Sequence, residues 1–561
     1  MTKTNHIAAL ALGGIGRIGM NMMVYECNGQ YIVVDAGVSF GDDSTPGVDI
    51  IIPDTKFLRE HGKNIKAVFI THAHEDHIGG IGYLWDDFGG APVYATPFAR
   101  LSMEGKLREM GIKPQKGQVN TAHVGEVIEV GPFKVEYVAV SHSIPEACGL
   151  AIGTPYGTVV HTADYKFDDQ ALLNWPTNEK RWAEIGKQGV LAAFGDSTGI
   201  FASKENVSEA EVLKHLDMLI GQAKHKVFFA SFASHVGRAL AVAELAAKHG
   251  RKTCFLGRTI NKMTGWAKEL NFYPNSLKGW VIDAEEAAKL PANKVLVFAS
   301  GTQGETEASL SRLANGTEVR GIRVTEGDSV ILSSRMIAGN EKAIMTVING
   351  LYSLGATMFT QINDKKTHVS GHASRPEIQR MYGLLKPRYV VPVHGETSHL
   401  MEHAKWAKEW GYTPLAIKPG YKLVLAGEGV EKAFTQTHVH PHGYNYVDGL
   451  FILGNDPLPI KERRKLSFDG VVSAAIAIRK SNGEWLGDVN ISTRGLIDEQ
   501  KQKAMITKAS ALCAKALETV FPDGLVDNTA QAGEVLSATL RKLFKQERGK
   551  SPSVLVQVVE I

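Results

Sequence analysis

Short apolar runs, separated by turns and amphipathic segments, recur along the chain. Runs of about four to eight apolar residues are typical of buried strands. They crowd together within residues 1–203, where helix-like segments at 82–88 and 97–110 interrupt them. The strands predicted in this part cover residues 8–12, 22–26, 31–34, 67–70, 92–95, 127–130, 133–140, 150–154, 158–162 and 190–195.

Strands and helices alternate in the residues that follow. A capping box at Ser208 and Glu211 opens the first helix. Val212, Leu216 and Ile220 share one face of that helix. Such alternation favours a second, parallel α/β unit. Its strands are predicted at 227–230, 252–256, 294–299 and 329–333, and its helices at 236–248, 305–313 and 341–352.

The last part of the chain begins with a change in composition. Residues 435–465 are rich in His, Pro, Gly and Asp and end in a basic run, which is typical of a linker. His438, His440 and His442 alternate there, but no carboxylate or thiolate stands beside them, so a specific metal site is not favoured. The remaining residues predict a small α+β domain, with strands at 471–478, 484–491 and 554–560 and helices at 498–519 and 533–544.

Length and composition limit the class of protein. A chain of 561 residues is too long for one ordinary core and predicts about two to four domains. Apolar residues make up 44% and charged residues 22%, as in globular proteins. No signal-peptide pattern opens the chain and no run of about eighteen apolar residues occurs, so we expect a cytoplasmic protein without a membrane span.

Cysteine usage and net charge add little chemistry. The four cysteines are scattered, which fits reduced thiols in the cytosol and argues against a cysteine metal site. The net charge of +3 neither demands nor excludes nucleic acid. Metal or substrate sites must therefore be sought in local clusters.

The densest such cluster follows the predicted strand 67–70, where residues 71–80 read THAHEDHIGG. A turn at the carboxyl end of a strand can aim imidazoles and a carboxylate into one cavity. Borderline ions such as Zn²⁺ favour that set of ligands. A His-rich surface loop is the alternative. The spacing His-x-His-x-Asp-His resembles the signature of the metallo-β-lactamase superfamily, and the candidate ligands are His72, His74, Asp76 and His77.

Further candidate ligands follow other predicted strands. They are His142, Asp164 and His394. Each alone is more typical of a turn or cap, but their repetition at strand ends favours one site. Seven ligands are too many for one tetrahedral ion and fit two. One ion would take His72, His74 and His142, the other Asp76, His77 and His394, and Asp164 would bridge them. If His394 completes this site, residues between about 203 and 372 are an insertion.

Two features near the start of the chain bear on this site. Asp35 ends the predicted strand 31–34, where a carboxylate commonly orients a ligand histidine, although an ordinary strand-end turn is the alternative. The glycine run at 13–16 is not followed by a helix pattern, so a hairpin is favoured over a dinucleotide site.

A two-metal site predicts hydrolysis. Two divalent ions roughly 3.5–4 Å apart would lower the pKa of a shared water toward about 7 and stabilise both oxygens of a phosphoryl displacement, without a covalent enzyme intermediate. The leaving alkoxide needs a proton. His372 is the predicted general acid, with Asp196 orienting it and favouring its protonated form. A structural histidine in a Ser-Gly turn is the alternative for His372.

Together these motifs resemble the ribonuclease J family, which are β-CASP members of the metallo-β-lactamase superfamily, over nearly the whole chain. The residues that carry the resemblance are HAHEDH at 72–77, Ser141 and His142, Asp164, GDST at 195–198, VSGHA at 369–373 and VHGE at 393–396, with further matches at 47–54, 232–234, 301–305 and 446–449.

The resemblance implies an α/β fold in which a metallo-β-lactamase αββα sandwich carries an inserted β-CASP parallel α/β domain and is followed by a small C-terminal α+β domain. The metallo-β-lactamase domain would cover residues 1–203 and 375–435. The β-CASP domain would cover 204–374, a linker 436–465, and the C-terminal domain 466–561.

The resemblance also implies a function. A bacterial ribonuclease of this family would act in RNA maturation and decay as a 5′-to-3′ exonuclease that prefers a 5′ monophosphate, with some endonuclease activity. Two Zn²⁺ per chain, or Mn²⁺ or Mg²⁺, would lie in a cleft between the first two domains. The C-terminal domain would support a homodimer or a tetramer.

The matching 5′-end pocket supplies donors suited to a terminal phosphate. Its residues are Phe232, Ala233, Ser234, His368, Val369, Ser370, Gly371 and His372. By the same resemblance Asp49 and Asp448 would hold a further cation, and surface turns are the alternative for both.

Two departures from the family pattern, at Arg17 and in residues 335–341, touch no proposed ligand. Two other functions stay open at this point. A hydrolase of small thioesters or lactams would not need the long insertion with its Ser-Gly-His motif. A catalytically idle RNA-binding scaffold would have no use for so many desolvated imidazoles and carboxylates.

Overall fold

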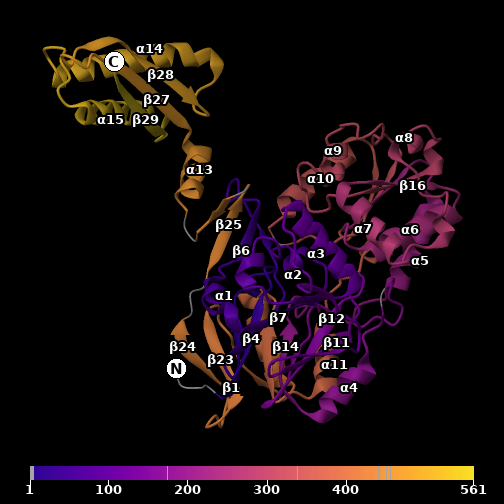
Figure 1. Cartoon of the computed structure of the whole chain (residues 1–561). Helices are drawn as coiled ribbons and strands as arrows, with labels where there is room; N and C mark the ends of the chain where they lie inside the picture. Colours follow the sequence, from indigo (N-terminus) through magenta and orange to yellow (C-terminus); the bar gives the residue numbers. More distant parts are fainter. Residues whose placement is uncertain (1–4, 174, 338, 440–442, 450, 455–456) are drawn as a thin grey trace. The chain divides into compact units, whose positions relative to one another are not determined.

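The computed structural model describes residues 5–173, 175–337, 339–439, 443–449, 451–454 and 457–561 (Figure 1). Residue contacts divide the chain into two compact units. The first comprises Met1–Ser39 and Ile51–Asn445, and the second Phe40–Ile50 and Tyr446–Ile561. Among the described residues, no helix is both long and apolar enough to cross a bilayer.

The first unit is built on two sheets that face each other. One has eight strands in the order β24 (Phe434–Val439), β23 (Tyr421–Gly427), β1 (His6–Ala11), β3 (Met23–Cys27), β4 (Gln30–Val34), β7 (Ile65–Ile70), β8 (Val93–Ala95) and β9 (Val119–Thr121). The other has seven, in the order β10 (Val127–Val130), β11 (Phe133–Ala139), β12 (Cys148–Thr154), β13 (Gly157–His161), β14 (Val190–Asp196), β20 (Tyr389–Val393) and β22 (Thr413–Pro414).

A single apolar core joins these sheets. Tyr25 and Phe69 of the first sheet and Tyr137, Phe194 and Val391 of the second belong to it. Helix α3 (Pro97–Glu109) packs on the first sheet, while α11 (Arg375–Leu385) and α12 (Thr397–Glu409) pack on the second. This is the expected αββα sandwich. Its other helices are α1 (Lys56–His61), α2 (Glu75–Ile78) and α4 (Glu179–Gln188).

The predicted helix at 82–88 is wrong in extent. Only Trp85–Phe88 is helical, as a 3₁₀ turn, and Gly89 ends it with a φ of 61°. The left-handed backbone that glycine allows stops the helix there.

A five-stranded parallel sheet, with helices packed against it, forms the predicted second α/β domain. Its strand order is β16 (Lys252–Leu256), β17 (Val295–Ala299), β15 (Val227–Ala230), β18 (Ser329–Leu332) and β19 (Thr357–Thr360). In Figure 1 it runs from magenta to salmon. Its helices are α5 (Glu209–Gln222), α6 (Val236–Lys248), α7 (Arg258–Glu269), α8 (Ala284–Ala287), α9 (Ser309–Ala314) and α10 (Glu341–Ser353).

Helix α9, which follows β17, starts later than predicted. The expected helix at 305–313 begins only at Ser309, because Glu305 first closes a turn by accepting a hydrogen bond from the amide of Ala308.

The chain returns to the sandwich after this sheet. Strand β20 pairs in parallel with β14, and Val393 stands opposite Asp196. A segment between β14 and α11 is therefore an insertion into the sandwich, as predicted from His394.

The glycine run at 13–16 also contacts the chain where it re-enters the sandwich after the insertion. Strands β1 and β3 pair antiparallel around it, as a hairpin requires. Within the connection, however, β2 (Ile15–Gly16) pairs in parallel with β21 (Gly395–Glu396). The glycine run therefore holds the residue that follows His394, a long-range pairing that local pattern does not reveal.

The second unit contains the predicted α+β domain. Its sheet has the order β28 (Trp485–Arg494), β27 (Val471–Ile478) and β29 (Ser553–Glu560). Helices α14 (Glu499–Val520) and α15 (Thr529–Arg548) cover it through a core that includes Ile476, Cys513, Leu536 and Phe544.

The segment 436–465 is more regular than a linker composition suggests. It contains β25 (Tyr444–Asp448), β26 (Phe451–Leu453) and the start of α13 (Leu458–Asp469). The first two pair antiparallel from Tyr446 to Leu453, and a proline in the first turn of α13 favours its helical start. The remaining short strands are β5 (Ser39–Phe40) and β6 (Ile50–Pro53).

Candidate metal and RNA site

All seven predicted ligands meet at one edge of the sandwich. Strands β13, β14 and β20 run parallel, so their carboxyl ends open on the same edge. His142 follows β11, Asp164 follows β13 and His394 follows β20. Among the described residues three groups of possible ligands have their ligand atoms within 4.8 Å of one another. Two consist of predicted ligands alone: His72, His74, His142 and Asp164, and Asp76, His77, Asp164 and His394. The third joins Asp164 and His394 to Asp196 and His372.

In the first group three imidazoles surround one carboxylate oxygen. Nδ1 of His74 lies 3.0 Å from Nε2 of His142. Oδ2 of Asp164 lies 3.7 Å from Nε2 of His142 and 3.8 Å from Nε2 of His72. These separations leave room for one cation among nitrogen and oxygen donors.

The second group shares Asp164. Its Oδ2 lies 3.2 Å from Nε2 of His77. Oδ2 of Asp76 lies 3.6 Å from Nε2 of His77 and 3.3 Å from Nε2 of His394. Because Asp164 belongs to both groups, it stands where a bridging carboxylate would.

Two nitrogen atoms show that these residues fit metal ions. Nε2 of His72 and Nε2 of His394 are fully buried and have no hydrogen-bond partner within the described part of the chain. An unpaired buried polar atom is costly. One cation in each group would satisfy them.

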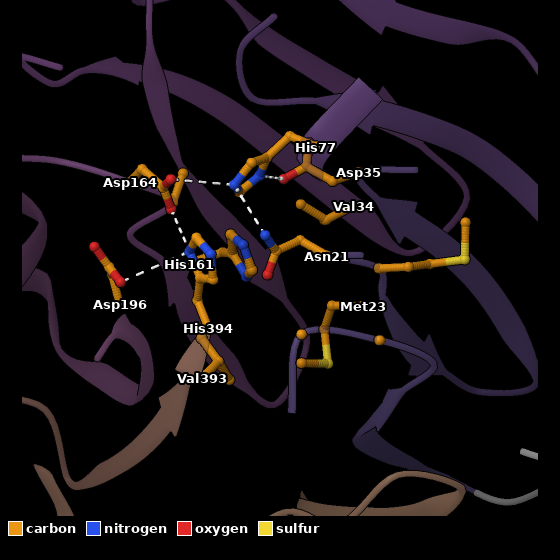
Figure 2. A pocket seen from close by; sticks show the side chains of 14 residues that line it. Asn21, Met23, Val34, Asp35, His77, His161, Asp164, Asp196, Val393 and His394 are labelled. Atoms are coloured by element: carbon orange, nitrogen blue, oxygen red, sulfur yellow. Dashed lines mark hydrogen bonds and ion pairs between the residues drawn. The ribbon is translucent and has the colours of Figure 1, made fainter. Parts of the chain in front are cut away.

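The ring orientation of two ligands depends on Asp35, whose contact with one of them, His77, is drawn in Figure 2. Nδ1 of His77 donates to Oδ2 of Asp35 over 2.7 Å. The hydroxyl of Thr71 also donates to Asp35, over 2.9 Å, and can accept from Nδ1 of His72 at 3.0 Å. Both rings therefore present Nε2 to the cluster. Asp35 is 1% exposed, which fits its predicted role rather than a surface turn.

Gly371 orients a third ligand. Nδ1 of His142 donates to its carbonyl over 2.6 Å, so Nε2 points toward His74 and Asp164. A Cβ on Gly371 would stand 2.7 Å from Oγ of Ser143 and 3.0 Å from Cε1 of His142. Only glycine fits this close approach.

The pKa shifts differ between the two groups. Burial, together with neighbouring imidazoles, lowers the pKa of His72 and His142 well below the ordinary value. Burial likewise lowers the pKa of His74 to about 4. These three histidines are therefore neutral at neutral pH, as metal ligands must be.

In the second group burial is outweighed by carboxylates. Asp164, Asp76 and Asp35 raise the pKa of His77 despite its burial. Asp164 and Asp76 raise the pKa of His394 to about 10, also against burial. In the absence of metal these imidazoles carry protons, which a cation at this position would replace.

His372 and Asp196 lie beside the shared carboxylate. Nδ1 of His372 donates to Oδ2 of Asp196 over 2.8 Å and lies 3.8 Å from Oδ2 of Asp164. Burial opposes protonation, but Asp196 and Asp164 raise the pKa of His372. Its side chain is 24% exposed, so the ring can meet a substrate.

Backbone strain gathers at this edge. Asp35, Ala163 and His394 have φ angles of 64°, 52° and 51°. Left-handed backbone is costly for residues with a side chain and persists where surrounding structure enforces it, often at functional sites.

The predicted 5′-end residues lie at the start of α6 and in the loop before α11. Phe232, Ala233, Ser234 and Ser370 are partly exposed, and His368 is 8% exposed. The amide of His372 donates to Oγ of Ser370 over 3.1 Å, so the serine hydroxyl hydrogen is free to donate elsewhere. The same short loop thus carries pocket donors and, through Gly371, a contact to a metal ligand.

The residues suggested for a further cation have protein partners. Oδ2 of Asp49 accepts from the amide of Gly449 over 2.8 Å. Oδ2 of Asp448 pairs with Arg463 over 2.6 Å. His440 and His442 of the alternating histidines lie outside the described residues.

Sequence reasoning missed several polar residues around the site. Nδ2 of Asn21 donates to the backbone oxygen of Asp76 over 3.1 Å and lies 3.0 Å from Nε2 of His77. Tyr25 and His161 form a buried hydrogen bond of 2.9 Å behind the cluster. Asn21 stands in a Met-Asn-Met run that carries no signal, whereas Thr71 directly precedes the motif and was a detectable neighbour.

Comparison with known families and structures agrees with this geometry. Four family models match in chain order: Metallo-beta-lactamase superfamily at 16–214, Ribonuclease J, beta-CASP domain at 224–351, Zn-dependent metallo-hydrolase RNA specificity domain at 363–416, and Ribonuclease J C-terminal domain at 458–561. The fold also resembles a crystal structure of a protein of unknown function from Enterococcus faecalis, with a TM-score of 0.54 and 18% identity, covering 75% of this chain and all of that one.

Three of the curated relatives match along almost their entire length. Ribonuclease J of Sinorhizobium meliloti is 37% identical, covering 100% of this chain and 98% of the relative. Ribonuclease J of Mycolicibacterium smegmatis is 34% identical, with 98% and 97% covered, and that of Thermus thermophilus 33%, with 99% and 96% covered. These matches favour a ribonuclease over a hydrolase of small molecules or an idle scaffold. The chain belongs to the ribonuclease J family of metal-dependent, hydrolytic ribonucleases.

Proposed function

We propose that this ribonuclease uses two divalent metal ions, Zn²⁺ being favoured by the nitrogen and oxygen donors and Mn²⁺ or Mg²⁺ being the alternatives. His72, His74 and His142 would hold one ion, Asp76, His77 and His394 the other, and Asp164 both. Bound ions would supply an activated water and charge stabilisation for phosphodiester hydrolysis. The two unpaired Nε2 atoms, of His72 and His394, are the observation that carries this assignment.

His372 is the proposed general acid. Asp196 accepts from its Nδ1, so the opposite nitrogen can deliver a proton to the leaving oxygen of the RNA. The raised pKa favours the protonated form that this role requires. Asp196 is itself fixed, because its Oδ1 accepts from the amide of Thr198 over 2.9 Å.

The proposed activities are 5′-to-3′ exonuclease with a preference for a 5′ monophosphate, and endonuclease. The observation that supports the preference is a single loop, residues 368–372, that reaches from the pocket donors to the metal ligand His142. The start of α6 adds a favourable dipole for a terminal phosphate. RNA without a phosphate end could still be cut internally, because none of the seven proposed metal ligands is itself a residue of the pocket.

The protein is further proposed to act in the cytoplasm, in RNA maturation and decay, as a homodimer or tetramer through its C-terminal domain. Strand β29 is an edge strand of its sheet and exposes Leu555 and Val559, and Ile561 directly after it is exposed as well. Exposed apolar side chains on an edge strand favour self-association.

A cleavage assay tests the activity. Purified protein is incubated with RNA of one sequence bearing a 5′ monophosphate, triphosphate or hydroxyl, with and without chelator. We expect metal-dependent release of mononucleotides, fastest from the monophosphate. His74→Ala should abolish it, whereas His123→Ala, at an exposed histidine, should not. Equal rates on all three ends would contradict the 5′ preference.

Ser370→Ala tests the pocket itself. Loss of its hydroxyl donor should weaken the monophosphate preference more than it slows internal cutting. Ser353→Ala on α10 removes another exposed serine hydroxyl and serves as the control. An equal loss of both activities would remove Ser370 from the pocket.

A further inference from the structure

A second buried cluster of charges lies between α5, α6 and the loop that carries His368. Glu209 is 3% exposed and Arg238 0%. Lys166 donates to Oε1 of Glu209 over 3.0 Å and pairs with Asp168 over 3.0 Å. The cluster contains two cations and two anions, Lys166, Arg238, Asp168 and Glu209, so its charges balance.

Arg238 uses its whole guanidinium in this cluster. Nε and Nη2 donate to the two carboxylate oxygens of Glu209 over 2.7 to 3.0 Å. Nη1 donates to Oγ of Ser333 over 3.2 Å and to Nδ1 of His368 over 2.8 Å. One arginine therefore connects the salt bridge to a histidine of the proposed 5′-end pocket.

That contact decides where the proton of His368 lies. Arginine is always a donor, so Nδ1 must accept and cannot carry hydrogen. The carbonyl of Ser333 lies 3.1 Å from the same Nδ1 and would favour the opposite tautomer if Arg238 were absent. Burial, and then Arg238, also lower the pKa of His368 well below its ordinary value, so the ring is neutral.

We propose that Arg238 is a positioning residue that holds His368 in the tautomer with hydrogen on Nε2, and that this N–H donates to the terminal phosphate of the RNA. Within the described residues no group hydrogen-bonds to Nε2 of His368. This nitrogen is also not one of the fully buried side-chain atoms that lack a partner, so a ligand can reach it. The inference rests on the proposed 5′-end pocket and adds the residue that makes its histidine a donor.

The opposite tautomer would reverse the contact. With hydrogen on Nδ1, His368 would donate to the carbonyl of Ser333 and turn the lone pair of Nε2 toward the phosphate. Nε2 would then be a hydrogen-bond acceptor and would repel the phosphate oxygens instead of donating to them. The effect would fall on recognition of the phosphate end and not on the metal cluster.

Arg238→Lys separates these effects. Lysine keeps the charge that Glu209 needs, but a point charge cannot span Glu209 and His368 as the forked guanidinium does. Arg251→Lys is the matched control, because Arg251 is another buried arginine of the inserted domain and donates only to backbone oxygens of residues 223, 225 and 295.

The assay compares kcat/KM for 5′-monophosphate and 5′-hydroxyl RNA, with cleavage of a circular RNA of the same sequence as the measure of an intact metal site. We expect Arg238→Lys to reduce the monophosphate preference roughly 10- to 100-fold, the value of a hydrogen bond to a charged group. Circular RNA should be cut within about threefold of the wild-type rate, and Arg251→Lys should keep the preference.

Nitrogen NMR of histidine-labelled protein gives a readout that a purely structural role would not move. His368→Gln identifies the signals of His368. We expect hydrogen on Nε2 in the wild type and on Nδ1 in Arg238→Lys. The same tautomer in both proteins overturns the proposal.

Two further variants leave Arg238 in place, in case Arg238→Lys fails to fold. The amide of His368→Gln can stand where Nε2 stood and should retain most of the preference, whereas that of His368→Asn reaches only to the position of Nδ1 and should lose it. Equal preference in these two variants contradicts the proposal. If the wild type itself does not distinguish monophosphate from hydroxyl, the proposed pocket fails; if it does and Arg238→Lys distinguishes them equally well, only the role of Arg238 fails.

Discussion

Two buried charged clusters of the first unit, the metal-ligand cluster and the Glu209–Arg238 cluster, can be compared directly. Both gather histidines and carboxylates from segments far apart in sequence. In the metal-ligand cluster two buried nitrogens, Nε2 of His72 and of His394, make no hydrogen bond within the described part of the chain. In the other cluster, both carboxylate oxygens of Glu209 and all three nitrogens of the Arg238 guanidinium have hydrogen-bond partners in the protein.

The difference shows how burial of charge serves two purposes. An unpaired buried nitrogen costs free energy unless a ligand satisfies it, so the first cluster is prepared for something that the chain does not supply. A closed ion pair needs no ligand, and its strict geometry fixes the side chains around it. The metal-ligand cluster should therefore respond to mutation mainly in activity, and the closed cluster mainly in stability and orientation.

The largest expected effect comes from Asp164→Asn. The amide keeps the shape but loses the charge that both ligand groups share. We expect RNA hydrolysis to fall at least about 10³-fold, or roughly 4 kcal/mol of barrier, with fewer than two metal ions retained per chain. Single-turnover cleavage and elemental analysis of bound metal measure this. Asp217→Asn, which changes a carboxylate paired with Lys248 and His249 away from the cluster, is the control. Full metal content with full activity would contradict the bridging role.

Glu209→Gln should have the next largest effect, on stability. It leaves Arg238 and Lys166 buried without their shared carboxylate, which typically costs about 3–5 kcal/mol. Urea unfolding of metal-free protein measures the change. A loss below about 1 kcal/mol would mean that the closed cluster relaxes to admit water.

Asp35→Asn should have the third largest effect, on the affinity for metal. The carboxylate accepts from Nδ1 of His77 and the Thr71 hydroxyl on Oδ2, and from the Thr71 amide on Oδ1. The NH₂ group of an amide cannot replace one of these oxygens, so Thr71 and the two ligand rings lose their fixed orientation. We expect about 10- to 100-fold weaker metal binding, with activity largely restored at high metal concentration. Competition titration with a chromophoric chelator provides the affinity. Unchanged affinity would show that Asp35 only closes the strand end.

The smallest effect concerns acid stability. Burial raises the pKa of Glu209, but Arg238, His235 and Lys166 outweigh it and hold that pKa well below its ordinary range. A carboxyl with a depressed folded pKa stabilises the protein above its unfolded pKa of about 4.3, and this contribution is lost as pH falls below that value. For each unit by which the pH falls below about 4.3, the free energy of unfolding of the wild type should decrease by up to about 1.4 kcal/mol more than that of Glu209→Gln. Parallel curves for the two metal-free proteins would contradict the assignment.

Local pattern was sufficient for much of the fold. Strands β15 and β27 and helix α6 occur at the predicted residues, because apolar period and capping residues act over a few positions. Less was visible where distant segments pair. The short strand β2 gains its partner, β21, only in three dimensions.

Sequence pattern was enough to group the candidate ligands. Imidazoles and carboxylates at successive strand ends must converge once the strands lie parallel, so His72, His142, Asp164 and His394 could be grouped before any coordinates. Only the tertiary structure decided how each ring is turned. Asp35 acts on His72 through Thr71, Gly371 acts on His142, and Arg238 acts on His368, each across a gap in sequence that no spacing rule covers. Hydrogen-bond direction depends on contacts of a few ångströms, and those contacts exist only after the chain has folded.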